Sequence, residues 1–112
     1  MITTLPATRD RPGRIVLVGE CGTPLATDLR GAGHLVDELL ASDFVPAGRS
    51  MADIVAVLPA CPDAARVGGI AASCARCVWF QEQAAPPGLA RLLQAAGVPC
   101  FEGRDLREEC LP

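Results

Sequence analysis

The residues of this sequence with the clearest potential for ligand chemistry lie in residues 14–24, which read RIVLVGECGTP. The apolar, mostly β-branched run IVLV predicts a strand buried on both faces of a parallel sheet. Gly19 and Gly22 permit a tight turn after that strand. Thr23 can cap a following helix, and Pro24 suits the first helical position, where no amide donor is needed. The stretch is therefore typical of a strand, a turn and the start of a helix.

A helix that begins in this way presents free N–H groups and a partial positive charge to an anion. Residues 19–24 could therefore hold the phosphate of a nucleotide-like ligand. An ordinary strand-to-helix turn without a ligand explains the same residues, and from this stretch alone it is the favoured interpretation. The glycine pattern is not G-x-G-x-x-G, so the dinucleotide fingerprint is absent.

The six cysteines offer a second kind of chemistry. Cys74 and Cys77 have C-x-x-C spacing, which could serve zinc or redox chemistry. A zinc site would need two more ligands, and a redox pair would open a helix, whereas this pair ends a helix and enters a strand. Buried thiols acting as small hydrophobic groups are the favoured interpretation. The cysteines are Cys21, Cys61, Cys74, Cys77, Cys100 and Cys110.

General acid–base catalysis has little support in the sequence. His34 is the single histidine, and the carboxylates are scattered along the chain without an evident pair. No nucleophile with a base and an orienting acid can be selected. The sequence therefore favours a non-catalytic protein.

Length and composition limit the class of protein. A chain of 112 residues with half of them apolar predicts one domain with a proper core. The net charge of −3 and the four aromatic residues argue against a nucleic-acid surface. No apolar run approaches the ~20 residues of a membrane span, and no signal peptide is visible, so a cytoplasmic protein is expected. Residues 1–13 are predicted to be a flexible arm and residues 14–112 a single domain.

The elements that must position these residues alternate between strand and helix. Helices are expected at 24–32, 64–73 and 86–96, with a further helical turn at 38–42. Residues 44–45 are a possible edge strand, residues 46–50 a loop, and residues 102–112 a charged tail. This alternation predicts an α/β protein: a three-layer Rossmann-like fold with a mostly parallel sheet of about five strands. The strands are expected at about 14–18, 34–36, 54–58, 77–81 and 98–101.

A ligand cleft is expected where the strand order of such a sheet reverses. Residues 19–24 and 58–62, which include Leu58 and Pro59, would then form opposite walls of one crevice. Gln81 ends a predicted strand at the same edge of the sheet. Asp37 follows the second predicted strand, where an acid can bind a ribose hydroxyl, although the favoured interpretation is that Asp37 and Glu38 are simply solvated.

Several segments together carry a resemblance to a known family. CVWFQ resembles a characteristic V-W-x-Q strand, and VGECGTP resembles a V-G-A-S-x-x-P phosphate loop. The segment GLARLLQAAGVPCFEGRDL resembles a closing helix and last strand. LRGAGHLV resembles a helix end with the second strand, and ADIVAVL resembles a further strand of the same family. Over about residues 14–106 the chain resembles the small stand-alone CoA-binding proteins. Their Rossmann-like domain is related to the CoA-binding domain of the succinyl-CoA synthetase alpha subunit.

The resemblance implies a non-catalytic CoA-binding protein with the ligand diphosphate at the loop. Gly19, Cys21 and Pro24 match that loop, and Gln81 matches the strand-end glutamine. The full set of candidate cofactor-binding residues is Gly19, Glu20, Cys21, Gly22, Thr23, Pro24, Asp37, Leu58, Pro59 and Gln81.

The chain departs from the family pattern at several of these positions. Glu20 adds negative charge beside the proposed phosphates, and Leu25 stands where a basic residue is usual. Asp37 and Glu38 stand where the family has an Asn-Pro type turn. Pro59 stands where an aromatic residue is usual, and Asp105 stands where a cysteine is usual. Because CoA carries several negative charges, these acids would oppose it.

Two functions are therefore expected from the sequence. One is the binding of CoA or a related nucleotide. The alternative is a degenerate CoA-binding-like domain that has lost the ligand and acts through protein contacts, as a subunit or homodimer. Trp79, the helix with Gly68 and Gly69, or the edge strand with Pro99 could supply that contact surface.

Overall fold

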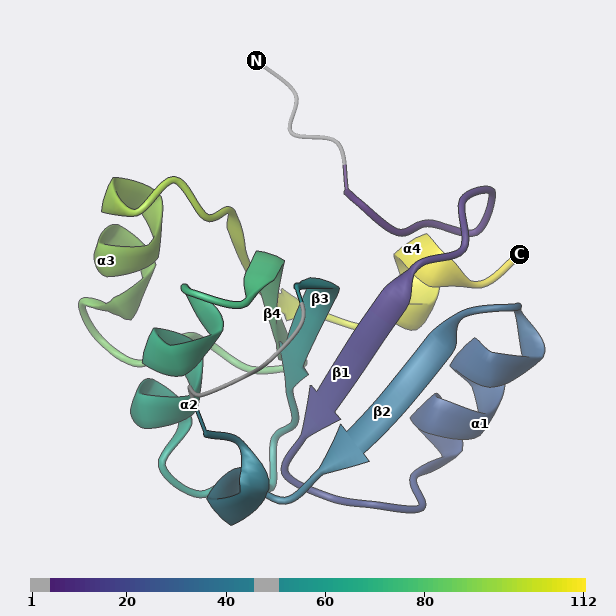
Figure 1. Ribbon diagram of the computed structural model, residues 1–112, viewed down its shortest axis with the longest axis horizontal. Helices are drawn as coiled ribbons and strands as arrows, with labels where there is room; N and C mark the ends of the chain where they lie inside the picture. The colour runs from purple at the N-terminus through teal and green to yellow at the C-terminus, as the bar shows by residue number, and fades with distance from the viewer. Residues whose placement is uncertain (1–4, 46–50) are drawn as a thin grey trace.

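The computed structural model describes residues 5–45 and 51–112, in which five strands alternate with helices (Figure 1). The predicted loop at 46–50 lies outside the described residues. The elements are β1 (Arg14–Val18), α1 (Pro24–Gly31), β2 (Leu35–Leu39), the 3₁₀ helix η1 (Ala41–Asp43), β3 (Ala52–Val57), α2 (Ala64–Ala71), β4 (Ala75–Gln81), α3 (Leu89–Ala95), β5 (Cys100–Arg104) and α4 (Arg107–Cys110).

All neighbouring strands of the sheet run parallel, in the order β2-β1-β3-β4-β5. The predicted α/β fold with a five-stranded parallel sheet is therefore confirmed. The chain leaves β1 for β2 on one side and then returns to form β3 on the other side of β1. The strand order reverses between β1 and β3, which is where a doubly wound sheet ordinarily has its ligand crevice.

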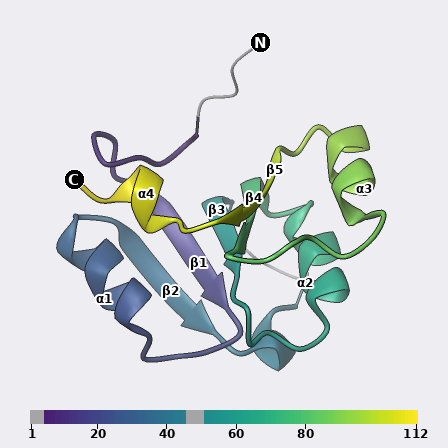
Figure 2. The same cartoon turned by 180° about the vertical axis from the view of Figure 1, so that it is seen from behind.

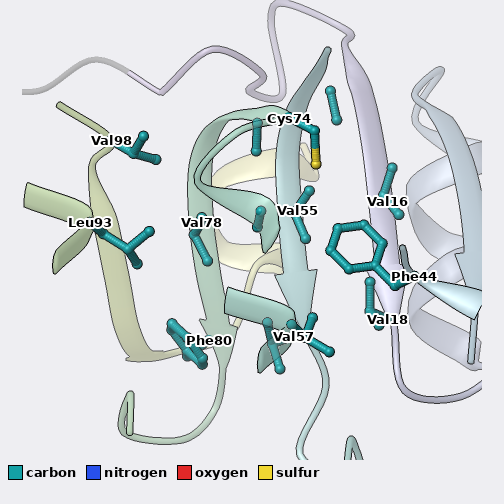
Figure 3. Packing of buried hydrophobic residues seen from close by; sticks show 14 of the residues in the cluster. Val16, Val18, Phe44, Val55, Val57, Cys74, Val78, Phe80, Leu93 and Val98 are labelled. Atoms are coloured by element: carbon teal, nitrogen blue, oxygen red, sulfur yellow. The ribbon is translucent and has the colours of Figure 1, made fainter. Parts of the chain in front are cut away.

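Two apolar cores cover the two faces of the sheet, so the domain has three layers (Figures 1 and 2). The α2/α3 core contains every second residue of the central strands together with side chains from α2, α3 and η1, as Figure 3 shows for Val16, Val55, Val78, Phe44 and Leu93. The α1/α4 core takes the alternate residues. Its buried members are Leu5, Ala7, Ile15, Leu17, Leu25, Ala26, Leu29, Ile54, Ala56, Leu58, Cys77, Trp79, Leu106 and Cys110.

Strand alternation explains this division. Trp79 and Phe80 are both fully buried, Trp79 in the α1/α4 core and Phe80 in the α2/α3 core. Their prediction on opposite faces is confirmed. Trp79 stacks on Phe101 of β5 with ring centroids 5.5 Å apart, which ties the edge strand to the centre of the sheet.

The close packing of α2 against α3 depends on Gly68. A Cβ at Gly68 would lie 2.5 Å from Leu89 Cδ2 and 3.2 Å from Phe80 Cζ, whereas one at Gly69 would meet nothing within 4 Å. The close approach expected at the glycine pair is therefore made by Gly68. Gly69 gives α2 no comparable contact.

The boundaries of several elements differ from the predicted ones. β2 extends to Leu39, and so includes two acids that a half-exposed edge strand tolerates. Phe44, predicted as part of an edge strand, is not in a strand. Its ring is fully buried in the α2/α3 core, so its apolar character reflects core packing and not strand pairing. β5 begins at Cys100 and continues to Arg104, into the segment predicted as a tail.

Residues 5–13 of the predicted arm pack with the domain. Ala7 is fully buried and Leu5 is nearly so, both in the α1/α4 core. Arg9 N–H donates to the carbonyl of Glu109 over 2.9 Å, so this segment lies against α4 (Figure 1). Of the described residues, no helix has the length and apolar composition that a membrane crossing requires.

Candidate functional site

A small cleft lies at the carboxyl ends of β1, β3 and β4, on the α1/α4 side of the sheet. Its volume is about 140 Å³, against the roughly 300–1,000 Å³ of ordinary small-molecule pockets. Six of the predicted site residues line it, together with Leu25, Glu82 and Arg107. The six are Glu20, Thr23, Pro24, Leu58, Pro59 and Gln81.

The two walls of the predicted crevice touch at Gly19. A Cβ on Gly19, whose φ is +134°, would lie 2.8 Å from the Cβ of Cys61 and 3.0 Å from its Cα. Only a glycine fits between the loop after β1 and the loop after β3. The crevice is therefore closed at residue 19, and the cleft that remains lies beside this contact.

The start of α1 has the predicted geometry. Thr23 is the N-cap, and its Oγ1 accepts a hydrogen bond of 3.2 Å from Ala26 N–H, while Pro24 takes the first helical position. These two residues leave few free amides in the first turn, because Pro24 has no N–H and Ala26 is capped.

The amides that precede α1 bind a carboxylate of the protein itself. Gly22 N–H and Thr23 N–H both donate to Glu38 Oε1, over 2.8 and 3.2 Å. Arg30 Nη1 donates to the other oxygen, Oε2, over 3.2 Å, and only 12% of the Glu38 side chain is exposed. Glu38 thus occupies the position in which an oxyanion of a ligand would meet the N-terminus of α1.

Sequence reasoning missed this role of Glu38 and left the residue as solvated. The alternation of a strand could have revealed this role. If the strand is continued through residue 38, Glu38 lies on the same face as Val36, next to α1. Asp37 points to the other face and forms an ion pair with Arg14 at 3.2 Å. It is not among the residues that line the cleft.

Gln81 closes the base of the cleft with hydrogen bonds inside the protein. It is 2% exposed, and its Oε1 accepts from Trp79 Nε1 at 3.1 Å and from Leu106 N–H at 2.8 Å. Its Nε2 donates to Asp105 Oδ1 at 2.7 Å and to Glu82 Oε1 at 3.3 Å. The amide therefore joins β4 to the start of α4, and all its ordinary donor and acceptor positions are used.

Arg107 brings positive charge to the cleft, but two acids hold it. Its guanidinium pairs with Asp28 at 2.9 Å and with Asp105 at 3.3 Å. Burial raises the pKa of the Asp105 carboxyl, but hydrogen bonds from Arg107 and Gln81 and the Arg107 charge outweigh burial, so this pKa lies below its ordinary value. The positive charge is thus balanced within the fold.

Cys74 and Cys77 do not lie side by side in the structure. Cys74 is buried in the α2/α3 core and Cys77 in the α1/α4 core, so the C-x-x-C pair spans opposite faces of the sheet. Burial raises the pKa of the Cys77 thiol to about 12, and that of Cys61 is also raised, first by burial and then by Asp63. Among the described residues no three potential ligands gather around a metal position.

Taken together, the cleft does not fit CoA in the position that the resemblance implies. Two amides of the loop are bound to Glu38, and the cation Arg107 is paired. The acids Glu20 and Glu82 line a cleft that is too small for a nucleotide.

Searches against protein-family models, curated proteins and solved structures find no match to this chain. The resemblance to CoA-binding proteins accordingly rests on the sequence motifs quoted above.

Proposed function

We propose that this chain is a non-catalytic Rossmann-like domain that works through contacts with protein, in which Glu38 has replaced the anionic group of a former ligand. The supporting observation is the Glu38 carboxylate on the amides of Gly22 and Thr23. A carboxylate at this position receives the same favourable dipole and hydrogen bonds as a phosphate. An external anion would have to displace a group that is tethered to the neighbouring strand.

Exposed apolar side chains support the protein contact. Four of the five large ones among the described residues belong to β2 or to the segments that join it to β3: Leu35, Leu40, Val45 and Met51. We refer to these four residues as the β2 margin. Within the described part of the connection from β2 to β3, the short η1 is the only helical element. A contiguous exposed apolar patch is typical of an interaction surface, and the proposal takes these exposed side chains as its starting point.

The proposed occupant of the β2 margin is a second copy of the chain, which is the simplest partner for a small domain with one apolar margin. A twofold interface would place each margin against its equivalent. The resulting homodimer needs no ligand in the cleft.

The competing function is CoA binding in the cleft. It is favoured by the convergence of Glu20, Thr23, Pro24, Leu58, Pro59 and Gln81 on one cavity. It requires Glu38 to leave the amides of the loop and the cleft to widen, so the state of Glu38 decides between the two proposals.

Replacing Glu38 by glutamine is expected to lower the free energy of unfolding by about 1–2 kcal/mol. The variant keeps a polar side chain but loses the charge that faces the amides and Arg30. Denaturation in urea measures the loss. Asp37→Asn is the matched control, because Asp37 is the adjacent acid in an exposed ion pair, and a change within about 0.5 kcal/mol is expected.

The wild-type protein also tests whether CoA or a related nucleotide binds. The melting temperature of the wild type should not respond to CoA, acetyl-CoA, NAD or ATP, and native mass spectrometry of the purified protein should show no bound CoA. A clear rise in melting temperature with CoA would contradict the proposed function and support the competing one. Equal losses in E38Q and D37N would show that Glu38 does not replace a ligand.

Replacing Leu35 by serine is expected to weaken self-association of the chain about tenfold or more. Leu35 is 72% exposed in the isolated chain, and burying a leucine in an interface contributes about 1.5–3 kcal/mol. Sedimentation equilibrium over a range of concentrations measures the dissociation constant.

Leu92→Ser is the control for this experiment. Leu92 lies on α3 and has a similar exposure of 69%, but it is not part of the β2 margin. Its replacement should leave the dissociation constant unchanged. A wild-type chain that stays monomeric at high micromolar concentration, or equal weakening in both variants, would contradict the homodimer.

A further inference from the structure

His34 joins the two ends of the chain by hydrogen bonds to backbone groups. It is the only histidine and is 4% exposed. Its Nδ1 accepts from Gly13 N–H at 3.1 Å, and its Nε2 lies 3.0 Å from the carbonyl oxygen of Cys110. Since one nitrogen must accept and the other must donate, the ring is neutral with its proton on Nε2.

The two backbone groups belong to segments that cover the α1/α4 core. Gly13 ends the N-terminal segment, in which Ala7 is fully buried, and Cys110 ends α4. The Cys110 thiol donates to the Ala7 carbonyl over 3.6 Å, so the segment and α4 also touch directly. Figures 1 and 2 both show this segment running beside α4. His34 therefore fastens residues 5–13 and α4 to the turn between α1 and β2.

We propose that His34 is a proton-operated latch, which holds residues 5–13 on the α1/α4 core when neutral and releases them when protonated. Imidazolium has two donors and no acceptor, so its Nδ1–H would face the N–H of Gly13. That amide would lose its partner in a partly buried position, and the ring would carry a buried charge. Histidine is the side chain that ordinarily changes charge between about pH 5 and pH 8.

Several charged side chains on the elements around the latch already have partners of their own. From β3, Asp53 accepts from Arg14 N–H at 2.8 Å and pairs with Arg76 of β4 at 3.4 Å. From β1 and β2, Arg14 pairs with Asp37. From α4, Glu108 and Glu109 pair with Arg104, and Arg9 of the N-terminal segment donates to the Glu108 carbonyl over 3.2 Å.

Neither nitrogen of the ring is bonded to any of these carboxylates, since both have backbone partners. Cys110 also carries a titratable thiol, whose pKa is raised to about 11, by burial and then by Glu109. It stays protonated across the range in which histidine titrates.

Amide hydrogen exchange in the full chain tests the latch. Between pH 7.5 and pH 5.5 the protection factors of Gly13 N–H and Arg9 N–H should fall several-fold, up to about tenfold, after correction for intrinsic exchange. The amide of Val55 in the central strand β3 should keep its protection, which separates release of the segment from global unfolding.

Two variants identify the titrating group. His34→Gln keeps a donor for the Cys110 carbonyl but cannot titrate, so its protection factors should not depend on pH. Asp53→Asn keeps an acceptor for Arg14 N–H and should show the response of the wild type. Unchanged protection in the wild type, or the same fall in H34Q, would overturn the proposal.

A measurement on the wild type alone covers the case in which H34Q does not fold. The ring nitrogens of the single histidine can be followed by NMR without ambiguity. At pH 7.5 Nδ1 should have the shift of an acceptor, and its protonation should coincide with the fall in Gly13 protection. Protonation of the ring with full Gly13 protection would refute the latch.

Discussion

Replacing Gln81 by leucine is expected to lower the free energy of unfolding by about 3 kcal/mol. Leucine fills a similar volume but offers no polar group. Leu106 N–H, at the start of α4, loses the oxygen it donates to, and Asp105 loses the shortest hydrogen bond from Gln81. Trp79 Nε1 keeps a second acceptor, the carbonyl of Arg104 at 3.2 Å, so the tryptophan should stay in place. The loss therefore comes mainly from the buried Leu106 N–H, which is left unpaired, because Asp105 keeps its hydrogen bonds from Arg107.

Urea denaturation followed by far-UV circular dichroism measures this loss. Gln94→Leu is the control, because Gln94 is an exposed glutamine on α3, and its replacement should change stability by less than about 0.5 kcal/mol. A similar small effect in Q81L would mean that Gln81 is not a structural clamp and is free to meet a ligand.

The fold could be predicted because local runs of apolar residues indicate its central strands. The runs IVLV, IVAVL and CVWFQ are largely apolar on both faces, as central parallel strands require. They lie in β1, at β3 and in β4, respectively. The edges were less predictable. In β2, Asp37 and Glu38 look like a turn, and only pairing with β1 in register from Arg14 to Val18 makes them strand residues. An edge strand carries a weaker signal because one face and one side are in solvent.

The candidate site was predicted in position but not in its contacts. Gln81 was expected at the carboxyl end of its strand, and it is there, but its amide is bound to Asp105, which lies 24 residues away in sequence. Glu38 lies 16 residues from Gly22, to which it binds. Neither contact follows from local spacing, because each depends on how two segments meet in the folded chain. The closure of the crevice by Gly19 and Cys61 was unpredictable for the same reason.

The C-x-x-C pair shows how a local pattern can mislead when the fold decides. Cys74 precedes β4 and Cys77 is its third residue, so the strand separates their side chains onto the two cores. A spacing that would suit zinc in a turn has no such meaning across a buried strand.

Replacing Gly19 by alanine is expected to destabilise the fold by about 3 kcal/mol. The φ of +134° is unfavourable for any residue with a Cβ, at about 1–2 kcal/mol. The added methyl group would also lie 2.8 Å from the Cβ and 3.2 Å from the backbone nitrogen of Cys61. Backbone atoms cannot rotate away as a flexible side chain can, so the loops after β1 and β3 must separate, at a further cost of about 1–3 kcal/mol.

Gly97→Ala separates the two contributions. Gly97 has a φ of +78°, but a Cβ there would meet nothing within 4 Å, so only the backbone cost of about 1 kcal/mol is expected. A difference of more than about 1 kcal/mol between G19A and G97A, measured by urea denaturation, reports the contact between the two loops, because their backbone costs differ by up to about that amount. If the two variants lose the same stability, the loops can part at no cost, and the crevice between β1 and β3 opens readily enough to admit a ligand. A loss at Gly19 that clearly exceeds the loss at Gly97 means that the switch point of the sheet is sealed by its own backbone, as the replacement of a ligand by Glu38 requires.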